Sequence, residues 1–380
     1  MDERAGYGGA ALPAGIVARH VENVNGLRMH LLEAGAGDDR PLLLLLHGFP
    51  ELAWSWRKVM PALAAAGFHV VAPDQRGYGA TTGWAGGYDT DLRPFGMLGL
   101  VRDAVGLLAA LGRKQAACVI GHDFGSPVAA WAALLRPDIF RAAALMSAPF
   151  PGPPSLPEAG APAQAAGLAE ALADLARPRK HYQHYYATRD ADGDMRDAPQ
   201  GLHAFLRAYY HMKSADWPQN QPHALADWSA AEMAQLPAYY VMDLACTMAA
   251  TVAPEMPDAQ AIAACTWLPE ADLAVYAARF AATGFQGGLN WYRAAQAPEV
   301  LADLQVFAGR AIEVPACYIA GASDWGIYQA PGALERMEQQ ACRRFLGRHL
   351  VPGAGHWVQQ EQPDATARLL LAFLQKAGRT

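Results

Sequence analysis

The sequence predicts an α/β protein built on one open, mostly parallel, doubly wound sheet with helices on both faces. Two observations favour this fold class. Strand and helix patterns alternate through residues 1–149, and strand patterns return over residues 310–380. Between them, residues 150–309 hold Ala-rich helical stretches and Pro-marked loops without a convincing central strand. We therefore expect a discontinuous core, formed by residues 1–149 and 310–380, that carries an inserted all-helical lid.

The N-terminal part supplies most of the predicted core. Residues 17–35 alternate as two edge strands that turn at Asn25-Gly26, a dipeptide typical of hairpins. The five leucines Leu42–Leu46 are typical of a central strand buried on both faces. Further patterns predict strands at 69–72, 116–120 and 142–146 and helices at 55–66, 98–111 and 126–135.

The alternation stops at a proline-rich segment and resumes far downstream. Strand patterns return at 314–320 and 349–352, and a helix pattern over 364–376 closes the predicted core. These two late strands extend the sheet, and the prolines mark the start of the lid. The prolines are Pro149, Pro151, Pro153, Pro154 and Pro157.

Composition excludes several classes of protein. The 380 residues are 52% hydrophobic and carry a net charge of -6, with acidic and basic residues mixed throughout. No basic stripe predicts nucleic-acid binding, and no polybasic tail predicts a lipid surface. The first residues, Met1-Asp2-Glu3-Arg4, lead into no apolar stretch of the kind a secretory signal needs, and no segment is long enough for a membrane span. We expect a cytoplasmic protein.

The cysteines and glycines point to no cofactor and no metal. The five cysteines are an odd number without a C-x-x-C pair, which is typical of reduced thiols in the cytosol. Zinc-ligand spacing, a phosphate-binding loop and the G-x-G-x-x-G pattern are all missing from the sequence. The cysteines are Cys118, Cys246, Cys265, Cys317 and Cys342.

A glycine-flanked acid follows the predicted strand at 116–120. In G-x-S-x-G hydrolases the nucleophile stands on a strained strand-to-helix turn, and its flanking residues are small so that the helix packs against the sheet. Here Gly121 and Gly125 frame the turn, and Asp123 stands where the serine would be. A serine ether formed at saturated carbon would be inert, whereas a carboxylate forms an ester that water cleaves. The alternative is that Asp123 only caps the following helix.

The two late strands each lead to one further residue of the right type. Asp324 follows the strand at 314–320, and His356 follows the strand at 349–352. Loops at the carboxyl ends of parallel strands meet in one crevice, so these residues are expected to join Asp123. The order nucleophile, acid, His is the one expected of such a sheet.

Taken together, these motifs resemble the epoxide hydrolases of the α/β-hydrolase fold. The matching segments are His47-Gly48-Phe49-Pro50-Glu51 with Ser55-Trp56-Arg57, Gly121-His122-Asp123-Phe124-Gly125 and Gly355-His356-Trp357. The resemblance extends to two lid segments, Tyr182-Gln183-His184-Tyr185 and Asn290-Trp291-Tyr292-Arg293. It implies that the hydroxyl groups of Tyr182 and Tyr292 hold the epoxide oxygen.

Chemistry independently favours tyrosines in this place. An epoxide oxygen leaves as an alkoxide, and a phenol can both hydrogen-bond and protonate it without bringing a charge into an apolar cleft. Four other tyrosines remain rivals for this role. They are Tyr185, Tyr186, Tyr239 and Tyr240.

The remaining expectations concern the oxyanion hole and the substrate. The backbone N–H groups of Phe49 and Phe124 are expected to form the oxyanion hole. Trp56, Trp291 and Trp357 are expected to line a cleft for a small hydrophobic epoxide, which would react with water. The chain is expected to act as a monomer or a homodimer.

Two alternatives stay open. A haloalkane or haloacid dehalogenase would share the carboxylate nucleophile, acid and His. Relatives of that kind commonly carry a halide-holding Trp or Arg after the nucleophile, where this chain has Phe124. A non-catalytic binding protein of the same fold is the other alternative, although such proteins usually lack one member of the triad.

Overall fold

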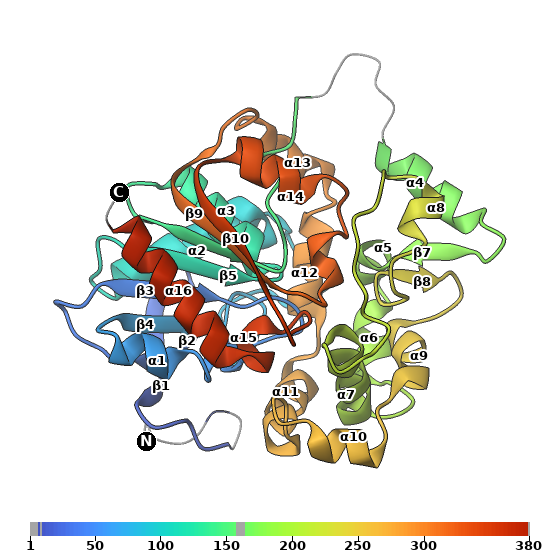
Figure 1. The fold of residues 1–380 in the computed structure, drawn as a ribbon, viewed down its shortest axis with the longest axis horizontal. Helices are drawn as coiled ribbons and strands as arrows, with labels where there is room; N and C mark the ends of the chain where they lie inside the picture. The colour runs from blue at the N-terminus through green and yellow to red at the C-terminus, as the bar shows by residue number, and fades with distance from the viewer. Residues whose placement is uncertain (1–6, 8–9, 157–163, 379–380) are drawn as a thin grey trace.

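Eight strands form one sheet, in the order β1-β2-β4-β3-β5-β6-β9-β10 (Figure 1). The structure is a computed structural model that describes residue 7 and residues 10–156 and 164–378; the first residues and Pro157 lie outside the described part. β1 pairs with β2 and β2 with β4 in antiparallel fashion, and every other neighbouring pair is parallel. The strands are β1 (Ile16–Val24), β2 (Leu27–Ala34), β3 (Leu42–Leu46), β4 (His69–Pro73), β5 (Cys118–His122), β6 (Ala143–Met146), β9 (Ile312–Gly321) and β10 (Cys342–Val351).

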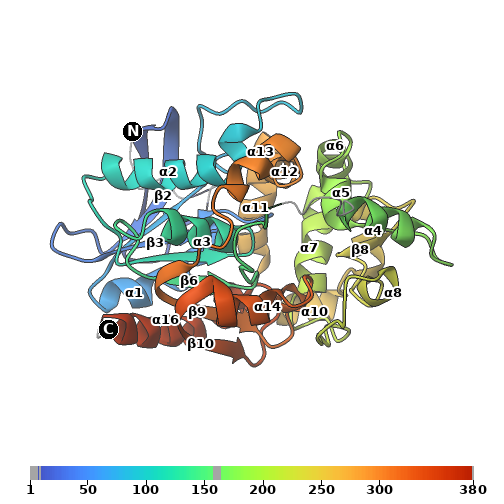
Figure 2. The ribbon, with the colours of Figure 1, turned by 90° about the horizontal axis from the view of Figure 1, so that it is seen from above.

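Helices cover both faces of the sheet, as the alternating pattern predicts (Figure 2). α2 and α3 lie together on one face, and α1 and α16 lie on the other. The all-leucine β3 is completely buried between these layers, which explains its uninterrupted apolar sequence. The helices are α1 (Met60–Ala65), α2 (Met97–Ala110), α3 (Gly125–Leu135) and α16 (Pro363–Ala377).

The inserted region lies to one side of the sheet and is mainly helical (Figure 1). It also contains a short antiparallel pair of strands, β7 (Arg179–His181) and β8 (Val241–Asp243), which the expectation of an all-helical lid missed. Three residues per strand are too few for a visible alternation. The helices of this region are α4 (Gln164–Ala173), α5 (Tyr182–Tyr186), α6 (Ala191–Arg196), α7 (Leu202–Lys213), α8 (Ala230–Met233), α9 (Met248–Val252), α10 (Ala259–Ala264), α11 (Glu270–Thr283), α12 (Gln286–Ala294) and α13 (Pro298–Gln305).

Most boundaries agree with the sequence to within a few residues, with two instructive differences. The helix expected over 55–66 is split into a 3₁₀ turn, η1 (Ala53–Trp56), and α1, because Pro61 favours a new helix start. β10 begins seven residues before the predicted 349–352, since its exposed arginines hide the strand pattern. The remaining short elements are η2 (Arg93–Phe95), η3 (Ala253–Glu255), η4 (Trp325–Ile327), α14 (Ala333–Arg336), the π-helical η5 (Met337–Ala341) and α15 (Val358–Glu361).

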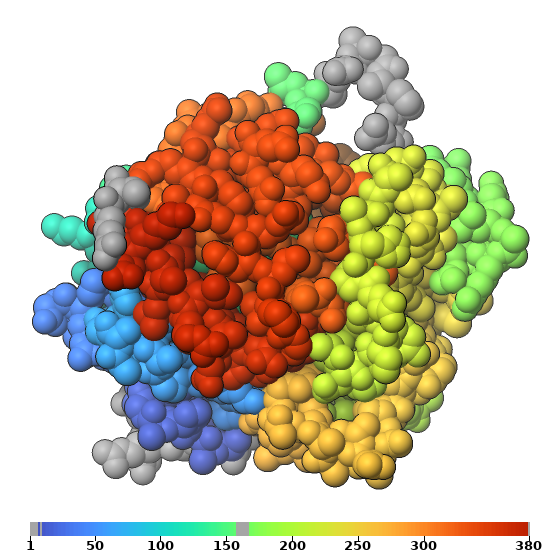
Figure 3. All heavy atoms as spheres, in the orientation of Figure 1, coloured from blue at the N-terminus to red at the C-terminus, as the bar shows by residue number. Residues whose placement is uncertain are grey.

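The lid packs directly against the C-terminal part of the core. In the space-filling view, the yellow-green lid segments lie against the orange and red C-terminal segments (Figure 3). Across the described ranges, no helix is both long enough and apolar enough to cross a membrane. All five cysteines are free thiols.

Candidate active site

Asp123 stands on a strained turn between β5 and α3. Its φ of 51° lies in the left-handed region, which residues other than glycine rarely adopt. The flanking glycines permit close backbone packing: a Cβ on Gly121 would lie 2.0 Å from the carbonyl oxygen of Gly125, and one on Gly125 would lie 2.2 Å from that of Leu46. The side chain of Asp123 does not cap α3. The turn therefore presents this carboxylate to the lid.

Asp123, Asp324 and His356 meet at the carboxyl ends of β5, β9 and β10. Nε2 of His356 lies 3.0 Å from Oδ2 of Asp123, and Nδ1 lies 3.0 Å from Oδ1 of Asp324. Asp324 also accepts a hydrogen bond of 2.7 Å from the Gly326 N–H at the start of η4, so it orients the imidazole and caps a turn at once. The three side chains are almost completely buried. The imidazole thus has a carboxylate on each side.

The charge of His356 stabilises the ionised forms of Asp123 and Asp324. Burial by itself would raise the pKa of Asp123, but the hydrogen bond and charge of His356, with smaller contributions from Lys213 and His122, hold it below its usual range. Burial likewise opposes ionisation of Asp324, yet the charge and hydrogen bond of His356 lower its pKa. Asp123 is therefore an ionised carboxylate at neutral pH, which is the form a nucleophile requires.

A backbone donor already contacts the carboxylate of Asp123. The N–H of Phe49 donates to Oδ1 of Asp123 at 2.9 Å. The N–H of Phe124 belongs to the residue that directly follows Asp123 and precedes α3. The contact from Phe49 fits an oxyanion hole, and that role stays a prediction for both N–H groups.

Two lid tyrosines share a cavity with Asp123. The cavity has a volume of about 430 Å³, and its wall includes Asp123, Phe124, Tyr182 and Tyr292. The two phenol rings lie 5.9 Å apart, and the Tyr292 ring packs edge-on against that of Phe124 at 4.9 Å. Burial raises the pKa of both phenols, so each hydroxyl keeps its proton at neutral pH. The rest of the wall consists of Met97, Pro127, Ala148, Pro149, Pro151, His181, Gln183, Trp228, Ala295, Gln296, Gln329 and Ala330.

The rival tyrosines are placed elsewhere. Tyr185 donates to Asp194 and Tyr239 to Asn220, while the hydroxyl of Tyr186 lies 3.2 Å from that of Tyr209. Neither these three nor Tyr240 line the cavity that holds Asp123. Among the tyrosines weighed from the sequence, only Tyr182 and Tyr292 do so.

The three tryptophans are not in the cavity wall, contrary to the sequence-based expectation. Trp56 is completely buried in η1. Trp291 donates to the backbone oxygen of Arg76 and packs under Phe124 at 5.3 Å. Trp357 donates to the backbone oxygen of Tyr210 and packs against the His356 ring at 4.7 Å. These tryptophans are close to site residues in the sequence, but they pack around the site and do not form the wall of the cavity.

Sequence reasoning missed a buried pair next to the triad. Nδ1 of His122 lies 2.6 Å from Oε2 of Glu51, and Nε2 of His122 lies 2.7 Å from the backbone oxygen of His356. Glu51 also accepts hydrogen bonds from the side-chain amides of Gln359 and Gln360. The pair fixes the loop that carries His356. Both residues stand inside the recognised motifs, but only the fold shows what they contact.

A second hidden residue is Lys213, at the end of α7 in the lid. Its side chain is 3% exposed, and its charge acts on both Asp123 and His356. A lysine in an amphipathic helix is ordinarily expected at the surface, so the sequence does not indicate that Lys213 is buried near Asp123 and His356.

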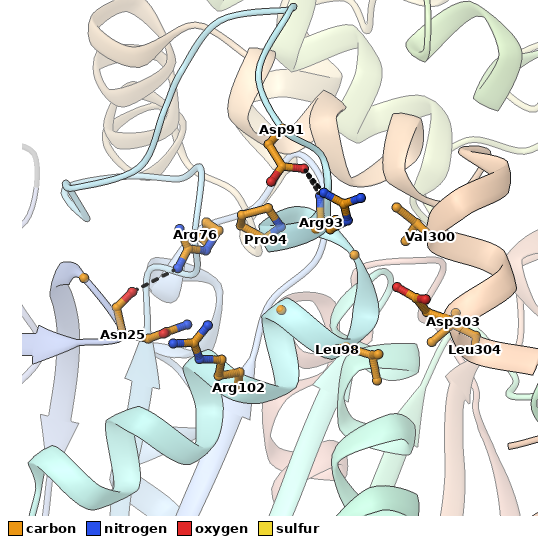
Figure 4. Close-up of a pocket in the computed structure, with 13 residues that line it drawn as sticks. Asn25, Arg76, Asp91, Arg93, Pro94, Leu98, Arg102, Val300, Asp303 and Leu304 are labelled. Atoms are coloured by element: carbon orange, nitrogen blue, oxygen red, sulfur yellow. Dashed lines mark hydrogen bonds and ion pairs between the residues drawn. The ribbon is translucent and has the colours of Figure 1, made fainter. Parts of the chain in front are cut away.

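A larger hollow of about 750 Å³ contains none of the predicted site residues (Figure 4). Two of the arginines that line it contact acids: Arg76 forms two hydrogen bonds with Asp103, and Arg93 faces Asp91. Within the part of the chain that the structure describes, no three His, Cys, Asp or Glu residues are grouped so as to hold a metal ion.

Known proteins that resemble this chain share its fold. Residues 41–184 match the family model of the alpha/beta hydrolase fold. Epoxide hydrolase B of Mycobacterium tuberculosis is 34% identical over 362 residues, which cover 93% of this chain and 96% of the relative. Among solved structures, an epoxide hydrolase from an endophytic Streptomyces has a TM-score of 0.76 at 30% identity and covers 97% of this chain and 98% of that chain. Potato epoxide hydrolase I has a TM-score of 0.71 at 30% identity, with 94% and 99% covered.

The sheet order and the strand-end triad thus define a protein of the α/β-hydrolase fold. Identity of 34% over nearly the whole chain narrows the class further. The chain belongs to the epoxide hydrolase family of that fold.

Proposed function

We propose that this protein hydrolyses small apolar epoxides to vicinal diols through a covalent ester on Asp123. The observation that carries the proposal is one cavity whose wall contains the carboxylate of Asp123 and two protonated phenols, those of Tyr182 and Tyr292. The names of the relatives, which are epoxide hydrolases, support the same reaction.

The first step is alkylation. The carboxylate of Asp123 attacks one epoxide carbon, and the carbon–oxygen bond of the ring breaks. The electron pair of that bond goes to the oxygen, which receives a hydrogen bond and then a proton from Tyr182 or Tyr292. Because both phenols are buried and neutral, they provide proton donors without adding a charge to the apolar cavity.

The second step is hydrolysis of the ester. His356 takes a proton from water, and Asp324 holds the imidazole in place through the contact at Nδ1. The resulting hydroxide attacks the carbonyl carbon of the ester on Asp123. The N–H groups of Phe49 and Phe124 stabilise the negative oxygen. Collapse of the intermediate breaks the ester bond, and the leaving alkoxide takes the proton from the His356 imidazolium and departs as the diol. The proton of the new carboxylic acid returns to the tyrosinate, which restores the Asp123 carboxylate and the phenol.

The cavity wall supports a substrate that is mainly apolar. Phe124, Met97 and Trp228 contribute large apolar surfaces, and the polar side chains near Tyr182 are uncharged amides and a histidine. Burial lowers the pKa of that histidine, His181, to about 4, so it is neutral at physiological pH. Among the described residues of the wall, Asp123 is then the only one that is charged, which disfavours anionic substrates.

A panel of aliphatic epoxides, styrene oxide and haloalkanes tests this proposal against the dehalogenase alternative. We expect diol formation from epoxides and no halide release from haloalkanes, with Asp123→Asn as the inactive control. Halide release without diol formation would replace the proposed reaction by dehalogenation. Binding of these compounds without any turnover would favour the non-catalytic alternative.

A further inference from the structure

Lys213 is a buried lysine that has no carboxylate partner within the described part of the chain. The last residue of α7, it places its ammonium group among four aromatic rings, and among the described residues it makes no ion pair. Nζ lies 5.1 to 5.7 Å from the ring centroids of Tyr209, Tyr239, Tyr240 and Trp357. Rings at this distance stabilise a desolvated cation.

Backbone contacts fix this lysine next to the loop of His356. The carbonyl oxygen of Lys213 accepts a hydrogen bond of 2.8 Å from the His356 N–H. A Cβ on Gly355 would lie 2.7 Å from that same oxygen and 2.5 Å from the carbonyl carbon of Ser214, so the loop passes directly over the end of α7. Glu361 joins the two segments as well, because its carboxylate accepts hydrogen bonds from the N–H groups of Ala215 and Gly355.

Three carboxylates act on the ammonium group of Lys213. The carboxylates of Asp123, Asp324 and Glu51 attract the ammonium, and the partial negative charge at the end of α7 does so too. Burial lowers the pKa of Lys213, the three carboxylates oppose this effect, and the net shift is downward. The carboxylate of Glu361 accepts hydrogen bonds from the backbone N–H groups of Ala215, Gly355 and Trp357.

His356 experiences the opposite effect. Burial and the charge of Lys213 lower the pKa of His356, whereas the charge of Asp324 and the hydrogen bonds to Asp123 and Asp324 raise it, and the net shift is upward. The rings of Trp357 and His122 pack against it, with centroids 4.7 and 5.1 Å away. Two carboxylates thus favour an imidazolium, which cannot accept a proton from water.

We propose that Lys213 is a positioning residue of the base: its caged ammonium disfavours a second positive charge on His356, so that the imidazole is neutral when the ester on Asp123 is hydrolysed. Alkylation converts Asp123 into a neutral ester, after which Asp324 is the remaining carboxylate in contact with the imidazole and Lys213 is the cation that opposes its effect. In this state Nε2 is free to accept the proton of the attacking water. The kinetic consequence rests on the function proposed above, whereas the effect on the titration of His356 does not.

The test is a direct titration of His356. Histidine labelled with ¹³C at Cε1 is incorporated, the His356 signal is assigned by its loss in His356→Gln, and its chemical shift is followed with pH by NMR. In Lys213→Met we expect the pKa of His356 to rise by about one pH unit relative to the wild type, because a nearby buried cation has been removed. Lys213→Arg keeps the charge and should titrate near the wild type.

A matched control removes the same charge elsewhere. Lys376, whose exposed Nζ donates to a backbone oxygen, lies on α16, and Lys376→Met should leave the titration of His356 unchanged. Thermal unfolding checks that each variant is folded, and Lys213→Gln repeats the measurement if Lys213→Met does not fold. Equal titration of His356 in the wild type and in a folded, charge-free variant would overturn the proposal.

A kinetic experiment tests the consequence for the reaction. Where the wild type turns over epoxide, the acidic limb of ester hydrolysis should move to higher pH in Lys213→Met, since a base of higher pKa loses its proton at higher pH. A uniformly slower reaction with an unmoved limb would indicate a purely structural role and overturn the proposal. A wild type that opens no epoxide would instead overturn the proposed function, and the NMR titration would still decide the role of Lys213.

Discussion

The core and the lid contribute to the site in different ways. In the core, three residues at the carboxyl ends of β5, β9 and β10 are joined by two contacts of 3.0 Å, and the sheet register fixes their positions. In the lid, Tyr182 and Tyr292 are held mainly by contacts between aromatic rings. The hydroxyl of Tyr182 also donates to Gln329 of the core at 3.2 Å. The core thus supplies precise polar geometry, and the lid supplies an aromatic cover that carries the two phenols we propose as proton donors.

This difference teaches how the two regions tolerate change. A hydrogen-bonded, buried charge cluster loses its function when one member is removed, because the others are left without their partner. A cover built from ring contacts can lose one hydroxyl and retain its shape. Substitutions in the core are therefore expected to be all-or-none, and those in the lid graded.

The largest expected effect belongs to the core nucleophile. Asp123→Asn should reduce epoxide opening by roughly 10⁴–10⁶-fold, by analogy with loss of a nucleophile in other hydrolases. Asn tolerates a positive φ as Asp does, and its side-chain oxygen can still accept the Phe49 N–H, so the fold should persist. Steady-state kinetics and thermal unfolding provide the measurement. A folded variant with substantial activity would contradict the role of Asp123.

The lid tyrosines should show the graded behaviour. Tyr182→Phe or Tyr292→Phe should each slow alkylation roughly 10²–10³-fold, and the double variant should lose far more, because no proton donor remains. Ester hydrolysis should change less, since it depends on His356. Pre-steady-state tryptophan fluorescence can separate the two phases.

Tyr185→Phe is the matched control for these variants. It removes a hydroxyl of the same lid helix, one that donates to Asp194 outside the cavity, and alkylation should continue at the wild-type rate. If the double variant Tyr182→Phe/Tyr292→Phe opened epoxides as fast as this control, the contrast between core and lid would fail at its lid side.

The smallest expected effect is on the alkaline side of the pH profile. Burial raises the pKa of Tyr182 and Tyr292 above the ordinary value of 10.0, so both phenols keep their protons as the pH rises toward that value. Single-turnover alkylation should therefore stay constant between neutral pH and about pH 10. An alkaline limb with a midpoint near pH 8 would show that a different group is the proton donor.

Much of the fold and of the candidate site could be predicted from the sequence, because the signals are local. The run of leucines predicted β3, Asn25-Gly26 predicted the hairpin of β1 and β2, and the glycine-framed turn predicted the place of Asp123. Strand ends in a parallel sheet meet at one edge, so Asp324 and His356 followed from the order of the elements.

The rest depends on contacts between residues distant in the chain. The short pair β7 and β8 has too few residues for a pattern, and tryptophans near site motifs were taken for cavity wall although they pack behind it. Glu51 meets His122 across 71 positions, and Lys213 meets the loop of His356 across more than 140. No spacing rule connects such residues before the fold is known.

The central claim is that Asp123 forms an ester, and intact-protein mass spectrometry of His356→Gln tests it most directly. Without the base, alkylation should proceed while hydrolysis stalls, so one equivalent of a small epoxide should add its mass to the protein. Peptide mapping should place the adduct on the segment containing Asp123, and Asp123→Asn/His356→Gln should show none. Failure to trap any adduct under conditions in which the wild type turns over, or an adduct on another residue, would contradict the account.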